Sequence, residues 1–314
     1  MHYLITGGAG FIGSHLCEVL LAAGHQLTIL DDLSTGKRAN VPAQAEIVVG
    51  DAADAQLLPE LIAQVDGVFH LAAIASVQQS TQQWSASSRT NQFATIALLE
   101  AIAKREGGTI PFVYASSAAV YGDPAAEFLP LKETTPTVPL SPYGADKLGS
   151  ELHARLARQL YGIPTLGLRF FNVFGERQDP SSPYSGVISI FMNRARAGQG
   201  VTIYGNGSQT RDFIYVKDVA ARLMAAMALL ESGEVPPPHA LNIGRGEAVS
   251  IQALAELIAR LNGRQPDITY EPERAGDIVH SCGDVSLSEQ LLSCAAPVSL
   301  EAGLKQMMAY HSAS

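Results

Sequence analysis

The stretch HYLITGGAGFIGSHL, residues 2–16, decides the fold of this chain. A short apolar run typical of a buried strand ends in a glycine-rich turn, and a helical pattern follows directly. The glycines have the spacing GxxGxxG: Gly7 permits a sharp turn, Gly10 lets the backbone approach a pyrophosphate, and Gly13 lets helix and strand pack closely. Free N–H groups at the start of a helix attract anions. The stretch therefore predicts a dinucleotide-binding strand, turn and helix.

The alternation of strand and helix continues beyond this turn. Apolar runs typical of strands lie at 2–6, 26–31, 46–49, 67–72, 110–115 and 164–170, and helical patterns lie at 14–23, 91–105 and about 142–161. Such alternation is typical of a parallel sheet with helices on both faces. We therefore predict an α/β fold: a Rossmann-like doubly wound parallel sheet with a smaller α/β C-terminal substrate lobe.

The pattern changes after Phe171. Residues 172–186 are rich in Pro, Ser, Gly and Asp, which indicates an active-site loop. Ser250 is the expected N-cap of a later helix. Helical patterns lie at about 187–198, 216–231 and 250–262, and the segment LNIG at 241–244 is strand-like.

The composition narrows the class of protein. With 47% hydrophobic and 16% charged residues, the chain fits a compact enzyme. The formal net charge of −9 argues against non-specific binding to nucleic acid or to an anionic membrane, since both need a basic face. No apolar run approaches the ~20 residues that cross a bilayer, and no signal peptide precedes the first strand. The three cysteines lack CxxC spacing and the eight histidines lack HxxxH spacing, so we expect a cytoplasmic protein without disulfides or metal.

Carboxylates at the ends of the next two predicted strands bear on the cofactor. Asp31 follows the glycine turn at the distance where an acid accepts hydrogen bonds from the adenosine ribose. A carboxylate there repels a 2′-phosphate and favours NAD over NADP, although Lys37 and Arg38 keep NADP as an alternative. Asp51 either reaches the adenine edge or caps the segment that follows it, and the sequence favours neither reading.

Tyr143 and Lys147 form a Tyr-x-x-x-Lys pair at the start of a predicted helix that Ser141 caps. Their spacing places both side chains on one face. A free tyrosine has a pKa of about 10, and we expect the lysine and a positive nicotinamide ring to lower it. Such a tyrosine removes a hydroxyl proton while hydride leaves the same carbon. Ser116 and Ser117 close a neighbouring strand, where open α/β sheets bind ligands.

With these residues assembled, the chain resembles the extended short-chain dehydrogenase/reductase family, and within it the UDP-glucose and UDP-N-acetylglucosamine 4-epimerases. The resemblance runs nearly end to end and rests on TGGAGFIGSHL, DDLSTG, HLAA, ASSAAVYGD, SPYGADK, LRFFNVFGERQDP, GNGSQTRDFIYVKDV, LNIG and RAGDIVHS. It implies a bound, recycled NAD and a UDP-hexose that passes through a 4-keto intermediate. It also implies that Ser117 is the catalytic serine, Tyr143 the base and Lys147 its partner.

The motifs and the resemblance together define the expected binding residues. The cofactor set is Gly7, Gly10, Phe11, Ile12, Gly13, Asp31, Asp32, Asp51, Ala52, Leu71, Ala72, Ala73, Asn91, Ser116, Tyr143, Lys147 and Phe171. The substrate set is Ser117, Asn172, Val187, Thr202, Tyr204, Arg211, Arg274, Asp277 and Ser281. We expect residues 1–171 with roughly 213–244 to form the NAD-binding domain, and residues 172–212 with 245–314 to form the UDP-sugar lobe. The resemblance also implies that Ser281 lies beside the sugar pocket, where its small side chain would leave room for an N-acetyl group.

Alternative functions remain open at this point. Sugar-nucleotide 4,6-dehydratases and decarboxylases place an acidic residue just after the catalytic Ser or Thr, where this chain has Ala118 and Ala119, so epimerase is favoured. A non-catalytic NAD-binding regulator is disfavoured because the serine, tyrosine and lysine are intact. Apolar stripes on 91–105 and 144–161, by the same resemblance, imply a homodimer through a four-helix bundle, although both helices could simply cover the sheet.

Overall fold

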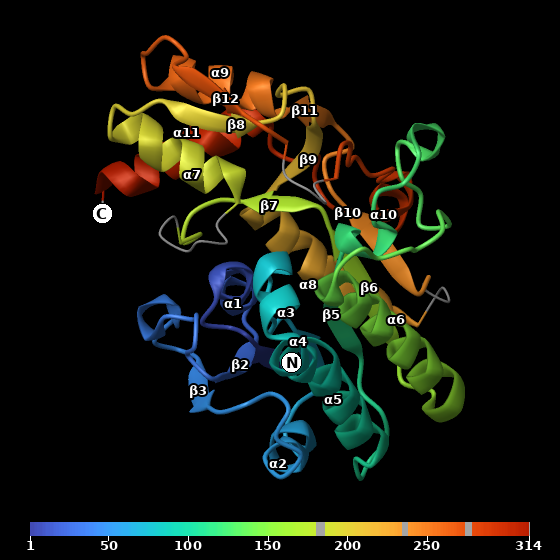
Figure 1. The fold of residues 1–314 in the computed structure, drawn as a ribbon. Helices are drawn as coiled ribbons and strands as arrows, with labels where there is room; N and C mark the ends of the chain where they lie inside the picture. The colour runs from blue at the N-terminus through green and yellow to red at the C-terminus, as the bar shows by residue number, and fades with distance from the viewer. Residues whose placement is uncertain (180–185, 234–237, 274–277, 314) are drawn as a thin grey trace.

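The computed structural model describes residues 1–179, 186–233, 238–273 and 278–313 (Figure 1). Its main sheet has seven strands in the order β10-β6-β5-β4-β1-β2-β3, and every pairing in it is parallel. The strands are β1 (His2–Thr6), β2 (Gln26–Asp31), β3 (Glu46–Val49), β4 (Gly67–His70), β5 (Phe112–Ser117), β6 (Thr165–Phe170) and β10 (Ala240–Ile243). The predicted fold class is confirmed.

The strand order reverses between β1 and β4, which lie side by side although β2 and β3 come between them in the chain. At such a reversal the connections leave the sheet in opposite directions, and a crevice opens beyond the carboxyl ends of the strands. The glycine turn follows β1 at this point. The topology therefore brings the predicted dinucleotide site and the end of β5 to one edge of the sheet.

Helices cover both faces of the sheet and enclose two apolar layers (Figure 1). On one face α1 (Phe11–Ala22) packs against α8 (Val216–Ser232), with Leu16 and Leu20 of α1 in one cluster with Leu223 of α8. On the other face α5 (Ala94–Ala103) packs against α6 (Pro142–Tyr161). The Ser141 hydroxyl caps α6 by accepting a hydrogen bond from the Gly144 N–H at 3.1 Å, as its sequence predicts.

A smaller lobe follows β6, with its own apolar core around Phe174, Phe191, Leu254 and Leu304. It contains a sheet of β7 (Asn172–Phe174), β9 (Thr210–Tyr215) and β11 (Ala248–Ser250), and a parallel pair of β8 (Val201–Tyr204) with β12 (Ile268–Glu271). Its main helices are α7 (Val187–Arg196), α9 (Ile251–Leu261) and α11 (Leu300–Ala313). The Ser250 hydroxyl accepts from the Ala253 N–H at 3.1 Å and caps α9, as expected.

Three expectations about elements need correction. The segment 172–186 does not begin as a loop, because Asn172–Phe174 pairs with β9, a partner some forty residues away that no local pattern reveals. The helix expected at 91–105 starts earlier and is interrupted by one π-helical turn, Arg89–Phe93. The strands expected at 67–72 and 110–115 end at His70 and Ser117.

The remaining short helices are α2 (Leu58–Ala63), α3 (Val77–Gln82), α4 (Trp84–Ser88) and α10 (Ser286–Leu291).

None of the helices in the described part of the chain has the length and apolar character needed to span a bilayer.

Candidate active site

The glycine turn has the shape of a cradle for a dinucleotide. Gly7 has a φ of +74°, and a Cβ placed on it would lie 2.6 Å from the backbone nitrogen of Ala72. A Cβ on Gly13 would overlap the carbonyl oxygen of Gly7, so α1 and β1 approach as closely as the sequence predicts. Gly10 is the N-cap of α1 and has no side chain to cap it. The first N–H groups of α1 are therefore available to an anion such as the pyrophosphate of NAD.

Asp31 at the end of β2 holds this turn in place. Its two carboxylate oxygens accept hydrogen bonds from the N–H groups of Ala9 and Leu33, each at 2.9 Å. Burial raises the pKa of Asp31, while these two hydrogen bonds act in the opposite direction. Each oxygen retains a further lone pair for a ribose hydroxyl. Lys37 is one of the two basic residues that keep NADP as an alternative cofactor in the sequence. Its ammonium lies 3.8 Å from the Asp179 carboxylate.

Asp51 and Asn91, two predicted cofactor residues, each bind the chain itself. Asp51 accepts from the Ala53 N–H at 2.8 Å and from Arg89 at 3.0 Å. It stabilises a turn and not the helix α2, whose N-cap is Leu57. The fully buried amide of Asn91 accepts from the Ile74 N–H at 2.7 Å and donates to the Ser87 hydroxyl at 3.0 Å. Asn91 thereby fixes the loop after β4 that contains the predicted residues Leu71, Ala72 and Ala73.

The other predicted cofactor side chains lie on several elements. Phe11 and Ile12 are the first residues of α1 and are partly buried, and Ala52 is buried after β3. The exposed Asp32 accepts from the Ser34 N–H at 2.9 Å. Phe171 is buried between β6 and β7, and its ring lies where a Cβ on Gly283 would go.

Ser117, Tyr143 and Lys147 come together from two elements. Ser117 is the last residue of β5, and the other two lie in the first turns of α6. The Ser117 hydroxyl is hydrogen-bonded to the Tyr143 side chain. The Lys147 ammonium lies 5.9 Å from the centre of the Tyr143 ring and donates to the carbonyl oxygen of Ala115 at 2.9 Å. The arrangement places a hydroxyl, a phenol and an amine at the carboxyl end of β5.

Burial dominates the electrostatics of this cluster. It raises the pKa of Tyr143, and the hydrogen bond from Ser117 lowers it. Burial also lowers the pKa of Lys147 from 10.5 to about 8, and the neighbouring carboxylate of Asp146 opposes this effect. The expected lowering of the tyrosine pKa by Lys147 is thus not produced by the chain alone. The amine is bound to the Ala115 carbonyl some distance from the phenol, and the phenol has lost its hydration.

Ser116 bonds a residue of α6 that lies about two turns beyond Tyr143. Successive side chains of a strand alternate between its two faces, so Ser116 and Ser117 face opposite sides of β5. The buried Ser116 hydroxyl donates to the Glu151 carboxylate at 2.5 Å, and Glu151 forms an ion pair with Arg169 of β6 at 2.7 Å. Sequence reasoning missed Glu151 and Arg169. The available signal was the spacing of Lys147 and Glu151, which places the two side chains one helical turn apart.

The predicted substrate residues of the smaller lobe lie on β7, β8, β9 and α7 and in the segment after β12. Thr202 and Tyr204 share the partly exposed face of β8, while its other face joins the core. The Arg211 guanidinium of β9 donates to the Thr210 carbonyl at 2.8 Å, and the Ser281 N–H donates to the same carbonyl at 3.1 Å. Asn172 begins β7 and Val187 begins α7. Arg274 and Asp277 lie outside the described residues.

The glycine cradle at the sheet reversal and the neighbouring Ser-Tyr-Lys cluster define a dinucleotide-dependent protein of the extended short-chain dehydrogenase/reductase class. A family model described as the NAD dependent epimerase/dehydratase family matches residues 3–244, and the chain belongs to this family. Its cofactor is NAD, as the sequence predicts, and the family resemblance seen in the sequence is confirmed.

Similar proteins cover the whole chain. The UDP-glucose 4-epimerase of Mycolicibacterium smegmatis is 35% identical over 99% of this chain and 98% of its own length. The crystal structure of UDP-glucose 4-epimerase from Thermotoga maritima with UDP-glucose is 34% identical, with a TM-score of 0.93 over 100% of this chain and 99% of that one. The UDP-N-acetylglucosamine 4-epimerase of Methanobrevibacter ruminantium M1, in complex with UDP-N-acetylmuramic acid, is 35% identical, with a TM-score of 0.91 over 99% and 98%.

Proposed function

We propose that this chain is an isomerase, a NAD-dependent UDP-hexose 4-epimerase. It interconverts UDP-GlcNAc with UDP-GalNAc, UDP-glucose with UDP-galactose, or both pairs, through a 4-keto intermediate. The observation that carries the proposal is the hydrogen-bonded pair of Ser117 and Tyr143, with Lys147 beside the ring, next to the glycine cradle. The full-length similarity to UDP-sugar 4-epimerases supports the same reaction.

Each member of the cluster has a distinct task in this proposal. Tyr143 takes the proton of the 4-hydroxyl and later returns it, and Ser117 orients that hydroxyl by hydrogen bonding. Lys147 is held against β5 by its bond to Ala115, with its ammonium 5.9 Å from the centre of the Tyr143 ring. Bound NAD supplies the hydride acceptor and a positive ring. Because burial alone raises the pKa of Tyr143, the tyrosine would need such a positive charge beside it to act as a base near neutral pH.

In this proposal, NAD and the UDP-sugar are bound by different parts of the chain. Residues 1–171 with about 213–244 hold NAD through the glycine cradle, Asp31 and the loop after β4. Residues 172–212 with 245–314 hold the UDP-sugar. The Arg211 guanidinium is a fork donor suited to the diphosphate, as is Arg274 from outside the described residues.

A dehydratase or a decarboxylase is the second candidate, and the residues after the serine disfavour it. Ala118 and Ala119 begin a 3₁₀ helix, Ala118–Tyr121, directly beyond Ser117. Elimination of water needs an acid and a base beside the sugar, and two methyl groups supply neither.

A direct assay tests the proposed reaction. Purified protein mixed with UDP-galactose, without added reductant, is expected to form UDP-glucose, and UDP-GalNAc is expected to form UDP-GlcNAc. Tyr143→Phe is the matched control, since it removes only the hydroxyl. Absence of conversion of every substrate, with NAD still bound, would instead support a non-catalytic NAD-binding regulator. Activity confined to the plain hexoses would refute the role given to Ser281 in admitting an N-acetyl group.

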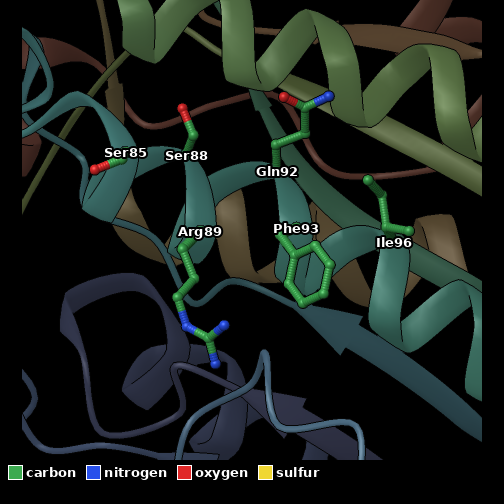
Figure 2. Close-up of a pocket in the computed structure, with 6 residues that line it drawn as sticks. All are labelled: Ser85, Ser88, Arg89, Gln92, Phe93 and Ile96. Atoms are coloured by element: carbon green, nitrogen blue, oxygen red, sulfur yellow. The ribbon is translucent and has the colours of Figure 1, made fainter.

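We further propose that the chain forms a homodimer through a four-helix bundle. Leu152, Leu156 and Leu160, spaced one turn apart on α6, are 44%, 45% and 69% exposed. A neighbouring surface hollow is lined by Ser85, Ser88, Arg89, Gln92, Phe93 and Ile96 of α4, the π-helical turn and α5 (Figure 2). In Figure 2 the Gln92 side chain points toward the helix above it, and a Cβ on Gly149 of α6 would touch that side chain. The exposed leucines and the hollow therefore belong to the same layer of helices, which is formed by α4, α5 and α6.

A second copy of the chain suits this layer because both partners then bury the same apolar stripe. Leu156→Glu is expected to convert a dimer to a monomer in light scattering coupled to gel filtration. Ile190→Glu is the control, since Ile190 is 40% exposed on α7 in the other lobe. A wild-type protein that is monomeric at high concentration would refute the dimer without affecting the proposed reaction.

A further inference from the structure

A buried polar cluster lies directly behind the catalytic serine. We call it the brace, and it consists of Ser116, Glu151 and Arg169. Glu151 Oε1 accepts from the Ser116 hydroxyl at 2.5 Å and from Arg169 Nε at 2.8 Å, and Glu151 Oε2 accepts from Arg169 Nη2 at 2.7 Å. Both charged side chains are less than one-tenth exposed. The brace therefore joins β5, α6 and β6 by short, charge-assisted hydrogen bonds.

The guanidinium end of the brace is itself anchored by residues that follow β5 and by a residue of β10. Arg169 Nη1 donates to the Tyr121 hydroxyl at 2.8 Å and to the Glu133 carbonyl at 3.0 Å. The Tyr121 hydroxyl donates to Asn242 Oδ1 at 2.7 Å. The Asn242 amide in turn donates to the carbonyl oxygens of Leu131 at 2.8 Å and Asp284 at 3.2 Å. The chain of bonds therefore ends three residues from Ser281, a predicted substrate residue.

The brace lies next to the residues that carry out the proposed reaction. Ser116 is the immediate neighbour of Ser117, and Glu151 lies one helical turn beyond Lys147 on α6. Any shift of the Ser116–Glu151 bond thus displaces β5 relative to α6 at the point where Ser117 meets Tyr143. A buried ion pair is weak support for stability, since well-packed apolar residues often serve as well. Placement of reacting groups, by contrast, is sensitive to shifts of about 1 Å.

We propose that Glu151 is a positioning residue of the epimerase: through Ser116 it sets the distance between Ser117 and Tyr143, and Arg169 on the neighbouring strand β6 fixes Glu151. This inference rests on the proposed function. Glu151 touches neither sugar nor cofactor in this role. It acts on catalysis only through the two strands and the helix that it joins.

Ser116→Ala tests the proposal because it removes one hydrogen bond and leaves the ion pair intact. Its matched control is Thr165→Val. The Thr165 hydroxyl is equally buried and donates to the Ala154 carbonyl at 3.1 Å, joining β6 to α6 at the opposite end of the sheet. For Ser116→Ala we expect kcat to fall on the order of tenfold or more, with KM within about twofold. For Thr165→Val we expect a similar fall in melting temperature and an unchanged kcat.

Two further variants and one further rate measurement complete the test. Glu151→Gln is expected to lower kcat more than Ser116→Ala, and Ser116→Thr, which keeps a hydroxyl, is expected to restore part of it. The rate of NAD reduction on mixing with UDP-sugar, followed by absorbance, should fall in parallel with kcat. If Ser116→Ala and Thr165→Val have the same kcat as the wild type, the positioning role is refuted. If the wild type itself does not interconvert UDP-hexoses, the proposed function fails instead.

Discussion

Replacing the buried lysine should make the protein more stable while it destroys catalysis. Burial lowers the pKa of Lys147 from 10.5 to about 8, so the folded state disfavours the ammonium. A difference of this size corresponds to roughly 3 kcal/mol of folding free energy near neutral pH. Lys147→Met removes this penalty and also removes the bond to the Ala115 carbonyl, which contributes about 1 kcal/mol. The expected net gain in unfolding free energy is about 2 kcal/mol.

The sign of the pH dependence follows from proton binding. Because the folded pKa lies below the unfolded one, the unfolded wild type binds more protons between about pH 8 and pH 10.5. Wild-type stability therefore rises with pH across this window. The advantage of Lys147→Met is complete below about pH 8 and disappears as the pH approaches 10.5.

Urea unfolding of both proteins at about pH 7 and about pH 10 measures the effect. The NAD content of each sample is determined alongside, so that linked cofactor binding is subtracted. Lys104→Met is the control, since Lys104 is 73% exposed in a surface ion pair and its loss should not change the pH dependence. A Lys147→Met protein that is less stable than the wild type near neutral pH, after this subtraction, would refute the reasoning.

Three other changes have defined outcomes. Tyr143→Phe should lower kcat by about 10²-fold or more with NAD content unchanged, because only the proton-transferring hydroxyl is lost; steady-state rates and the absorbance of bound cofactor measure this. Gly13→Ala should abolish NAD retention on gel filtration, since a Cβ there overlaps the Gly7 carbonyl and forces α1 away from β1. Ser250→Ala should cost about 1 kcal/mol in urea unfolding, since the Ala253 N–H loses its cap, and kcat should remain unchanged.

The parts of the fold that depend on short-range chemistry could be predicted from the sequence. The strand before Gly7, the glycine turn and the helix after it are encoded within some twenty residues, and the structure has them as expected. The caps Ser141 and Ser250 are equally local, since each bonds an N–H three residues on. The Tyr143 and Lys147 pair was likewise visible from its spacing alone.

The parts that depend on distant partners could not be predicted. The strand β7 exists because Asn172–Phe174 pairs with β9, and its Pro- and Gly-rich continuation hid this pairing. Ser116 resembles a second catalytic serine in sequence, and only the pleat of β5 and the partner Glu151 show that it faces the other way. The effect of burial on the pKa of Tyr143 is equally hidden in the sequence, because burial depends on the whole assembled fold.

Several charged side chains are buried around the end of β5 and along α6, at a cost in stability. Lys147, Asp146 and the Glu151–Arg169 pair are all nearly inaccessible, although charged side chains are usually exposed. Burial disfavours both the ammonium of Lys147 and the carboxylate of Asp146. An apolar core would pack here with less penalty. Since the helix and strand that carry these charges also carry Ser117 and Tyr143, the cost is best explained by the chemistry of the site, and the stabilising effect expected of Lys147→Met measures it directly.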